Sequence, residues 1–259
     1  MASIHYGKIK TAAQVKAWLR HCDSEQRLIR EHKNEHIDKN KISENINFMK
    51  LSYEESCDRF TERVKELDST TNKNKRKDRV QCFGLCISMP EGLSRENEVG
   101  LMEETVKLFE KEYGKKNLIS AVAHYDEVHE YVRDAEIRES RGHLHIFIVP
   151  ELQGQLCGKK FSSKNEMKRM NREIDKVCFE KFGVHFLTGE KAMKKSVEEM
   201  KADSKEVERL YKLNRAIEKK CIEDLVSIIE KEPGTLNFVS EAAEIAHGKK
   251  KMKKKCIER

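Results

Sequence analysis

The sequence predicts an α+β domain, in which helices pack on one face of an antiparallel sheet, followed by a long helical extension. The first observation is the order of elements over residues 81–149, which runs strand, helix, strand, strand. The second is a long region beyond residue 195 in which apolar residues recur at helical spacing. We expect residues 1–194 to form one domain, residues 195–247 the helical extension, and residues 248–259 a basic, disordered tail.

The first part of the chain is expected to contain one strand and two helices. Residues 1–9 favour a short strand, and residues 11–35 are compatible with a helix. Residues 52–67 also repeat apolar residues at helical spacing. Residues 40–48 and 69–79 are polar, so we expect irregular connections there. The expected core anchors of the two helices are Val15, Trp18, Leu19, Phe60, Val64 and Leu67.

The next part is expected to supply three strands and a helix. Residues 81–88, 117–124 and 142–149 are rich in β-forming side chains. Between the first two strands, Ser94 is a residue type that caps helix N-termini, and Gly114 is one that ends helices. This alternation is typical of an α+β domain.

The composition indicates a soluble protein of the cytoplasm. Charged residues make up 37% of the chain, and the longest apolar runs are far too short to span a bilayer. The first 20 residues lack the pattern of a secretory signal. The net charge of +7 permits nucleic-acid binding without requiring it. The eight cysteines form no CxxC pair, so we expect reduced thiols, with Cys82 and Cys86 as small buried residues rather than metal ligands.

Three histidines on two expected strands form a candidate metal site. His143 and His145 alternate on one strand, so both side chains point to the same side of the sheet, and Leu144 points to the other. His124 ends the preceding strand, and an antiparallel pairing would bring it to the other two. Three imidazoles leave open positions on a divalent cation, as catalysis requires.

Two carboxylates lie two and three residues after His124. Asp126 and Glu127 are suitable partners to orient the imidazoles, and they could also assist proton transfer. The alternative is that they begin a solvated loop, because residues 126–141 form a polar insertion. His129 is expected to be exposed within that insertion.

These residues resemble a known family. His-hydrophobic-His on a strand is the signature of the HUH endonucleases, so the sheet is expected to be of the HUH type. The fuller pattern resembles the MobV (Mob/Pre) branch of plasmid relaxases, over roughly residues 1–210. The insertion between Glu127 and His143 is longer than is usual in the family, and so is the spacing from His21 to Arg27. The matching positions are His124, Asp126, Glu127, His143, His145, Val149 and Pro150, a looser N-terminal motif of His21, Arg27, Asn34, Ile37, Asp38 and Asn45, and the later segments Phe161 to Lys164 and Gly183 to Lys201.

The resemblance implies an enzyme that nicks one DNA strand at a transfer origin, with Mn²⁺ or Mg²⁺ on His124, His143 and His145. In this branch the nucleophile is a histidine, here His21 by position, which would form a covalent link to the 5′-phosphate of the DNA. Glu127 is expected to act with it. The alternative nucleophiles are His32, His36, Tyr6, Tyr125 and Tyr131; on its strand, Tyr125 points away from His124.

Basic residues recur every four positions after the expected caps Ser162 or Ser163, in a helix that runs to about residue 182. They lie on one stripe of that helix, which suits a phosphate backbone as well as it suits an ordinary solvated face. Trp18 is expected in the core rather than as a platform for DNA bases. The predicted DNA contacts are Lys164, Lys168, Arg172 and, from the N-terminal motif, Arg27, Asn34, Asp38 and Asn45, with Lys176 continuing the stripe.

Further partners and functions stay open. A conjugation coupling protein and a second copy of the chain, held through the helical extension, are the possible protein partners. A rolling-circle replication initiator of the same HUH superfamily is the first alternative function. A DNA-binding protein without catalytic activity, in which the histidines hold a structural metal ion, is the second.

Overall fold

The structure is a computed structural model that describes residues 3–29, 37–70, 76–127, 130–133 and 136–187, with isolated positions beyond them. The chain divides into two compact units, residues 1–195 and residues 196–259. The predicted helical extension and basic tail fall in the second unit, almost wholly outside the described residues. In the described part of the chain, no helix combines the length and the apolarity that crossing a membrane requires.

The first unit is built on a five-stranded antiparallel sheet with the strand order β1-β3-β7-β4-β2. This confirms the predicted α+β fold with an antiparallel sheet. The predicted strands all form, and β7 lies at the centre of the sheet. The strands are β1 (Ser3–Ile9), β2 (Ile46–Asn47), β3 (Cys82–Ser88), β4 (Leu118–His124) and β7 (His143–Ile148).

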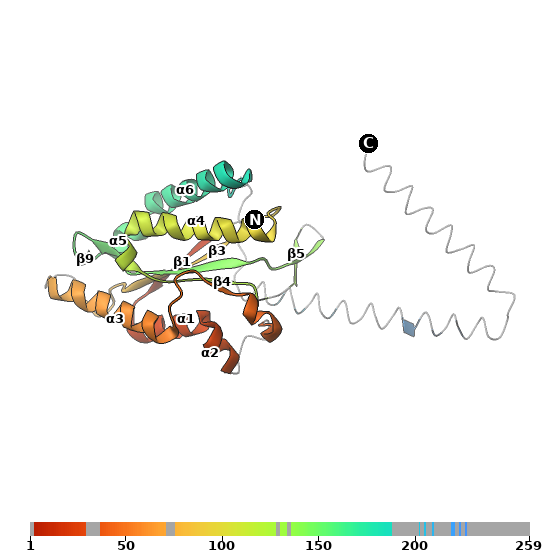
Figure 1. The fold of residues 1–259 in the computed structure, drawn as a ribbon, viewed down its shortest axis with the longest axis horizontal. Helices are drawn as coiled ribbons and strands as arrows, with labels where there is room; N and C mark the ends of the chain where they lie inside the picture. Colours follow the sequence, from red (N-terminus) through yellow and green to blue (C-terminus); the bar gives the residue numbers. More distant parts are fainter. Residues whose placement is uncertain are drawn as a thin grey trace. The chain divides into compact units, whose positions relative to one another are not determined.

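Helices cover both faces of this sheet, not one face as the sequence suggests (Figure 1). Alternate residues of β3 and β7 enter two separate cores. Leu85 and Ile146 pack with α4 and α6, whereas Cys82 and Phe147 pack with α1 and α3. All seven residues of β4 are buried, as expected for a strand covered on both sides. The helices are α1 (Ala12–Cys22), α2 (Ser24–Ile29), α3 (Tyr53–Thr70), α4 (Arg95–Tyr113), α5 (Gly158–Phe161) and α6 (Lys164–Phe182).

The helix predicted over residues 11–35 is interrupted at Asp23. Thr11 caps α1, which ends at Cys22, because Asp23 adopts an extended conformation. The Asp23 carboxylate then accepts a hydrogen bond from the backbone N–H of Gln26 in the first turn of α2. The chain therefore leaves the helix two residues after His21.

Regular structure occurs in one segment predicted to be irregular, residues 40–48, and in the polar insertion after β4. Residues 40–48 include most of a 3-10 helix, η1 (Lys39–Glu44), and the edge strand β2. The insertion after β4 forms the hairpin of β5 (Glu130–Arg133) and β6 (Glu136–Glu139). The remaining elements are η2 (Lys115–Asn117), β8 (Glu151–Leu152) and β9 (Gln155–Leu156).

Candidate active site

Strand pairing brings the three predicted metal ligands together. His124 lies opposite His143 in the β4–β7 register, and His145 follows two residues later on the same face of β7. The ring centroid of His124 lies 5.4 Å from that of His143 and 4.7 Å from that of His145, and the centroids of His143 and His145 are 4.9 Å apart. The imidazoles of two neighbouring strands therefore converge beneath α1.

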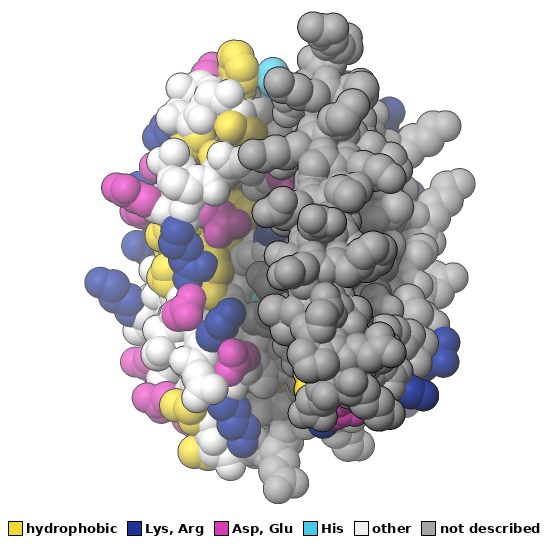
Figure 2. Space-filling view, turned by 90° about the vertical axis from the view of Figure 1, so that its right-hand side faces the viewer, with side chains coloured by type: hydrophobic (Ala, Val, Ile, Leu, Met, Phe, Trp, Pro, Cys, Tyr) yellow, Lys and Arg dark blue, Asp and Glu magenta, His cyan; other side chains and the backbone are white. Residues whose placement is uncertain are grey.

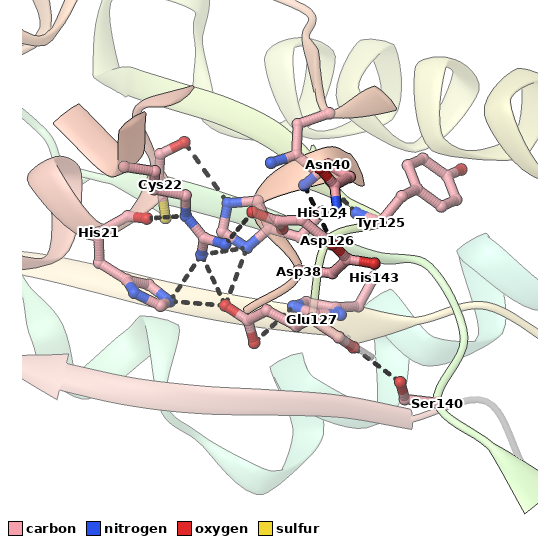
Figure 3. Close-up of polar contacts among 12 residues, drawn as sticks. His21, Cys22, Asp38, Asn40, His124, Tyr125, Asp126, Glu127, Ser140 and His143 are labelled. Carbon is pink, nitrogen blue, oxygen red and sulfur yellow. Dashed lines mark hydrogen bonds and ion pairs between the residues drawn. The ribbon is translucent and has the colours of Figure 1, made fainter. Parts of the chain in front are cut away.

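His21 joins this cluster from the last turn of α1. Its ring centroid lies 5.5 Å from that of His124 and 5.9 Å from that of His145. Its Nε2 lies 3.1 Å from Oε1 of Glu127 (Figure 3). The predicted nucleophile is thus beside the predicted metal ligands.

Glu127 lies among the imidazoles rather than at the start of a solvated loop. Besides His21, its carboxylate lies 3.5 Å from Nδ1 of His124 and 3.6 Å from Nε2 of His143 (Figure 3). Its side chain is only 18% exposed. One carboxylate therefore faces the side chains of three histidines.

Arg27 connects the elements of the site from inside the protein. Nη1 donates to Asp126 at 2.5 Å, and Nη2 donates to Glu127 at 2.6 Å. Nη2 also lies 3.0 Å from Nδ1 of His124, and Nε donates to the carbonyl oxygen of His21. Arg27 and Asp126 are both fully buried. In this structure the Arg27 guanidinium is buried and occupied by two carboxylates, so it has an internal structural role, and its contact with DNA stays a prediction.

The ionisation states favour cation binding. Burial lowers the pKa of His124 to about 4, although its hydrogen bond with Glu127 acts in the opposite direction. Burial also lowers the pKa of His143 and, further, that of His145. Burial acts to raise the pKa of Glu127, but hydrogen bonds with His124 and His21 outweigh it and hold this pKa well below its usual range. At neutral pH the three ligands are neutral imidazoles, the form that binds metal ions, beside an ionised carboxylate.

The predicted ligands approach one another in pairs, but no donor group among the described residues contains all three of His124, His143 and His145. Three groups of donor atoms lie within 4.8 Å of one another among the described residues, and each pair of predicted ligands occurs in one of them. The first group is His21, His124 and His145, the second is Cys86, His143 and His145, and the third is His124, Glu127 and His143. Nδ1 of His124 already faces a positive charge, the guanidinium of Arg27, while its Nε2 lies 3.4 Å from the carbonyl oxygen of Cys22. A cation at Nδ1 of His124 would therefore have to displace Arg27, whereas the Glu127 carboxylate supplies a negative charge between His124 and His143.

Asp38 and Asn45 support the segment that carries the site. The backbone N–H of Asp38 donates to the carbonyl oxygen of Asp126, and the Asp38 carboxylate caps η1. The side-chain oxygen of Asn45 accepts a hydrogen bond at 2.7 Å from the backbone N–H of Tyr125. Both residues have structural roles here, and their contact with DNA stays a prediction. Asn34 lies outside the described residues.

The basic stripe of α6 is exposed but distant from the histidines. Its members Lys164, Lys168 and Arg172 face solvent, and the opposite side of α6 packs into the core shared with α4. The imidazoles lie beside Trp18 and His21 of α1. Helix α1 covers the face of the sheet opposite α6 (Figure 1). On the described part of the face in Figure 2, basic and acidic side chains are interspersed. The net charge therefore does not mark a DNA-binding face by itself.

The structure separates two alternative nucleophiles from the cluster. Tyr6 and Tyr125 pack with the core of α4 and α6, on the face opposite the imidazoles. The side chain of Tyr131, and His32, His36 and His129, lie outside the described residues.

Two residues near the site differ from their predicted roles. Trp18 is 47% exposed rather than buried, and its ring centroid lies 5.7 Å from that of His21, one helical turn away. Cys86, expected to be a buried residue like the fully buried Cys82, is partly exposed and lies opposite His145 in the β3–β7 register. Neither position shows in the sequence, because each depends on how segments far apart in the chain pack.

Comparison with known proteins gives consistent matches. Residues 1–202 match the family model described as plasmid recombination enzyme. A plasmid recombination enzyme type 2 of Staphylococcus aureus is 26% identical over 213 residues, which cover 80% of this chain and 43% of that protein. A plasmid recombination enzyme of a Bacillus species is 29% identical over 165 residues, which cover 61% of this chain and 36% of that protein. The chain spans less than half of the length of these relatives.

Solved structures share the fold. The relaxase domain of MobM, bound to manganese and plasmid oriT DNA at pH 6.8, superimposes with a TM-score of 0.62 at 22% identity, covering 78% of this chain and 97% of that one. A second such complex, at pH 5.5, gives a TM-score of 0.59 at 20% identity and covers 78% and 98% of the two chains. With its family match over residues 1–202 of 259, the chain belongs to the plasmid recombination enzyme (Mob_Pre) family.

Proposed function

We propose that this chain is a mobilisation relaxase, which nicks one DNA strand at a transfer origin through a covalent bond between His21 and the 5′-phosphate. Family membership supports the class of enzyme, and MobM was solved with manganese and oriT DNA. The observation that carries the proposal is the position of His21 beside Glu127 and the three converging imidazoles.

Glu127 prepares His21 for attack. The ionised carboxylate accepts a hydrogen bond from Nε2–H of His21 at 3.1 Å. This hydrogen bond selects the tautomer of His21 whose lone pair is on Nδ1. Nη2 of Arg27 also lies 3.2 Å from Nε2, but it already donates to Glu127 at 2.6 Å, so it holds the carboxylate in place rather than competing for the imidazole.

The covalent transfer is a single displacement at phosphorus. The Nδ1 lone pair of His21 forms the bond to phosphorus, the bond from phosphorus to the 3′ oxygen breaks, and that oxygen takes a proton from solvent. The imidazole becomes positive, and its Nε2 proton passes to Glu127 or is stabilised by it. A divalent cation on His124, His143 and His145 supplies Lewis-acid polarisation of the phosphate when bound. Because the bond energy is conserved in the covalent link, the strand can be rejoined later.

The test is a nicking assay on a supercoiled plasmid that carries the transfer origin of this chain's own genetic element. With Mn²⁺, wild-type protein is expected to release nicked plasmid and to form a DNA-linked peptide that contains His21, identified by mass spectrometry. His21→Ala should keep metal and DNA binding but form no adduct. His185→Ala is the matched control, because His185 is exposed and paired with Asp175, away from the cluster. A link to a tyrosine, or an adduct with His21→Ala, would reject the proposed nucleophile.

The same assay separates the alternatives. A replication initiator would nick a plasmid carrying the replication origin instead of one carrying the transfer origin. A protein with only a structural metal ion would bind DNA and leave both plasmids supercoiled. Docking to a coupling protein and dimerisation through residues 195–247 stay predictions.

A further inference from the structure

The central strand of the sheet presents its two histidines to donors on both sides. On one side, β4 supplies His124 opposite His143. On the other side, β3 supplies Cys86 opposite His145. Cys86 faces the same way as these imidazoles, because Phe83, Leu85 and Ile87 of β3 pack in the core on the opposite face.

Cys86, His143 and His145 meet the basic requirement for a metal site of their own. One donor atom from each lies within 4.8 Å of the others, and the Cys86 thiol is free. His145 is only 7% exposed, and its Nε2 has no hydrogen-bond partner among the described residues. A buried polar nitrogen without a partner costs free energy, and a bound cation would satisfy it.

The donor types select the class of cation. A thiolate with two imidazoles suits thiophilic cations, above all Zn²⁺, which binds Cys and His in nearly tetrahedral sites. Mn²⁺ and Mg²⁺ prefer oxygen donors, and the Glu127 carboxylate supplies oxygen in the donor group with His124 and His143 on the other side of β7. The two sides of β7 therefore favour different metals.

We propose that Cys86, His143 and His145 form a binding site for Zn²⁺ or another thiophilic divalent cation, which excludes the cation used for nicking. This inference rests on the proposed function only in its consequence, because the two sites share His143 and His145. Binding replaces the proton of the Cys86 thiol by the metal, and the proton is released to solvent. The protein would thus be inhibited by zinc at the imidazoles that hold its catalytic cation.

The test is a titration of the full chain with Co²⁺, a spectroscopic substitute for Zn²⁺. Wild-type protein is expected to show a sulfur-to-cobalt charge-transfer band, which Zn²⁺ then removes by displacement. Cys86→Ser should abolish the band and weaken Zn²⁺ binding at least about tenfold, since even supporting partners of a ligand contribute that much. Cys157→Ser is the matched control, because Cys157 is a partly exposed thiol that belongs to none of the donor groups found among the described residues.

Two further measurements keep the outcomes distinct. Cys86→Ala, with circular dichroism as a check of folding, should behave as Cys86→Ser does. In the nicking assay, Zn²⁺ should inhibit wild-type protein at lower concentrations than it inhibits Cys86→Ser. A charge-transfer band that survives in both Cys86 variants, or no band in folded wild-type protein, overturns the zinc site. A band without any nicking activity keeps the zinc site and rejects the proposed function.

Discussion

Replacing Arg27 by methionine tests the idea that a buried cation holds the candidate site together. Methionine keeps much of the side-chain volume but removes the positive charge that faces Asp126 and Glu127. Asp126 is fully buried, so its carboxylate is left charged without its partner or must take up a proton. Both outcomes cost free energy in the folded state only.

The expected loss follows from burial. Removing one partner of a buried ion pair costs about 3–5 kcal/mol, which is a large share of the roughly 5–15 kcal/mol that stabilises a domain. The second carboxylate, on Glu127, favours the upper part of this range. With a urea dependence of about 2 kcal/mol per M, the midpoint of unfolding should fall by about 2 M.

The assay is urea unfolding followed by circular dichroism, with Arg76→Met as control. Arg76 pairs with Asp78 at 2.7 Å, but their side chains are 78% and 57% exposed, so its midpoint should not change measurably. Combining Arg27→Met with Asp126→Asn should recover part of the loss, because the stranded charge is then removed. If Arg27→Met shifts the midpoint no further than Arg76→Met, the interpretation of Arg27 as an internal support is wrong.

Three further predictions concern DNA, metal and pH. Trp18→Ala should weaken binding of single-stranded origin DNA by about 1–3 kcal/mol, because it removes an aromatic ring beside His21 on which a base can stack. Trp18→Phe should retain most of the affinity in the same fluorescence anisotropy measurement. Equal loss of affinity in both variants would argue against stacking. Mn²⁺ at about 100 times its dissociation constant should stabilise the protein against thermal unfolding by about 2.7 kcal/mol. His145→Ala should remove most of this stabilisation. If the variant is stabilised as much as wild-type protein, the metal binds elsewhere. The hydrogen bond with Arg169 is the main cause that lowers the pKa of Glu166 in the folded protein. The ionised carboxylate therefore contributes stability above its unfolded pKa, and this stability is lost as the pH falls through its folded pKa. Glu166→Gln should destabilise the protein at pH 7 and flatten the acid side of the plot of unfolding free energy against pH, and an unchanged plot would refute this.

The local features of the site could be read from the sequence. The alternation of His143 and His145 predicts a shared face of a strand, because successive side chains of a strand point to opposite sides. The caps Ser94 and Ser163 and the stop at Gly114 mark helix ends through hydrogen bonds that depend on near neighbours only. The position of Glu127 three residues after the strand that ends in His124 likewise predicts a carboxylate near the imidazoles.

The tertiary structure decided which residues meet across the chain. The sequence identifies Arg27 as a basic residue but does not predict its burial between Asp126 and Glu127. That burial depends on α2 packing against the end of β4. The cover on both faces of the sheet depends in the same way on helices from both ends of the domain. Contacts between distant segments are set by packing and strand register, which local residue patterns do not contain. The residue pattern is therefore enough to propose His124, His143 and His145 as metal ligands, whereas the position of Cys86 opposite His145 follows only from strand pairing in the fold.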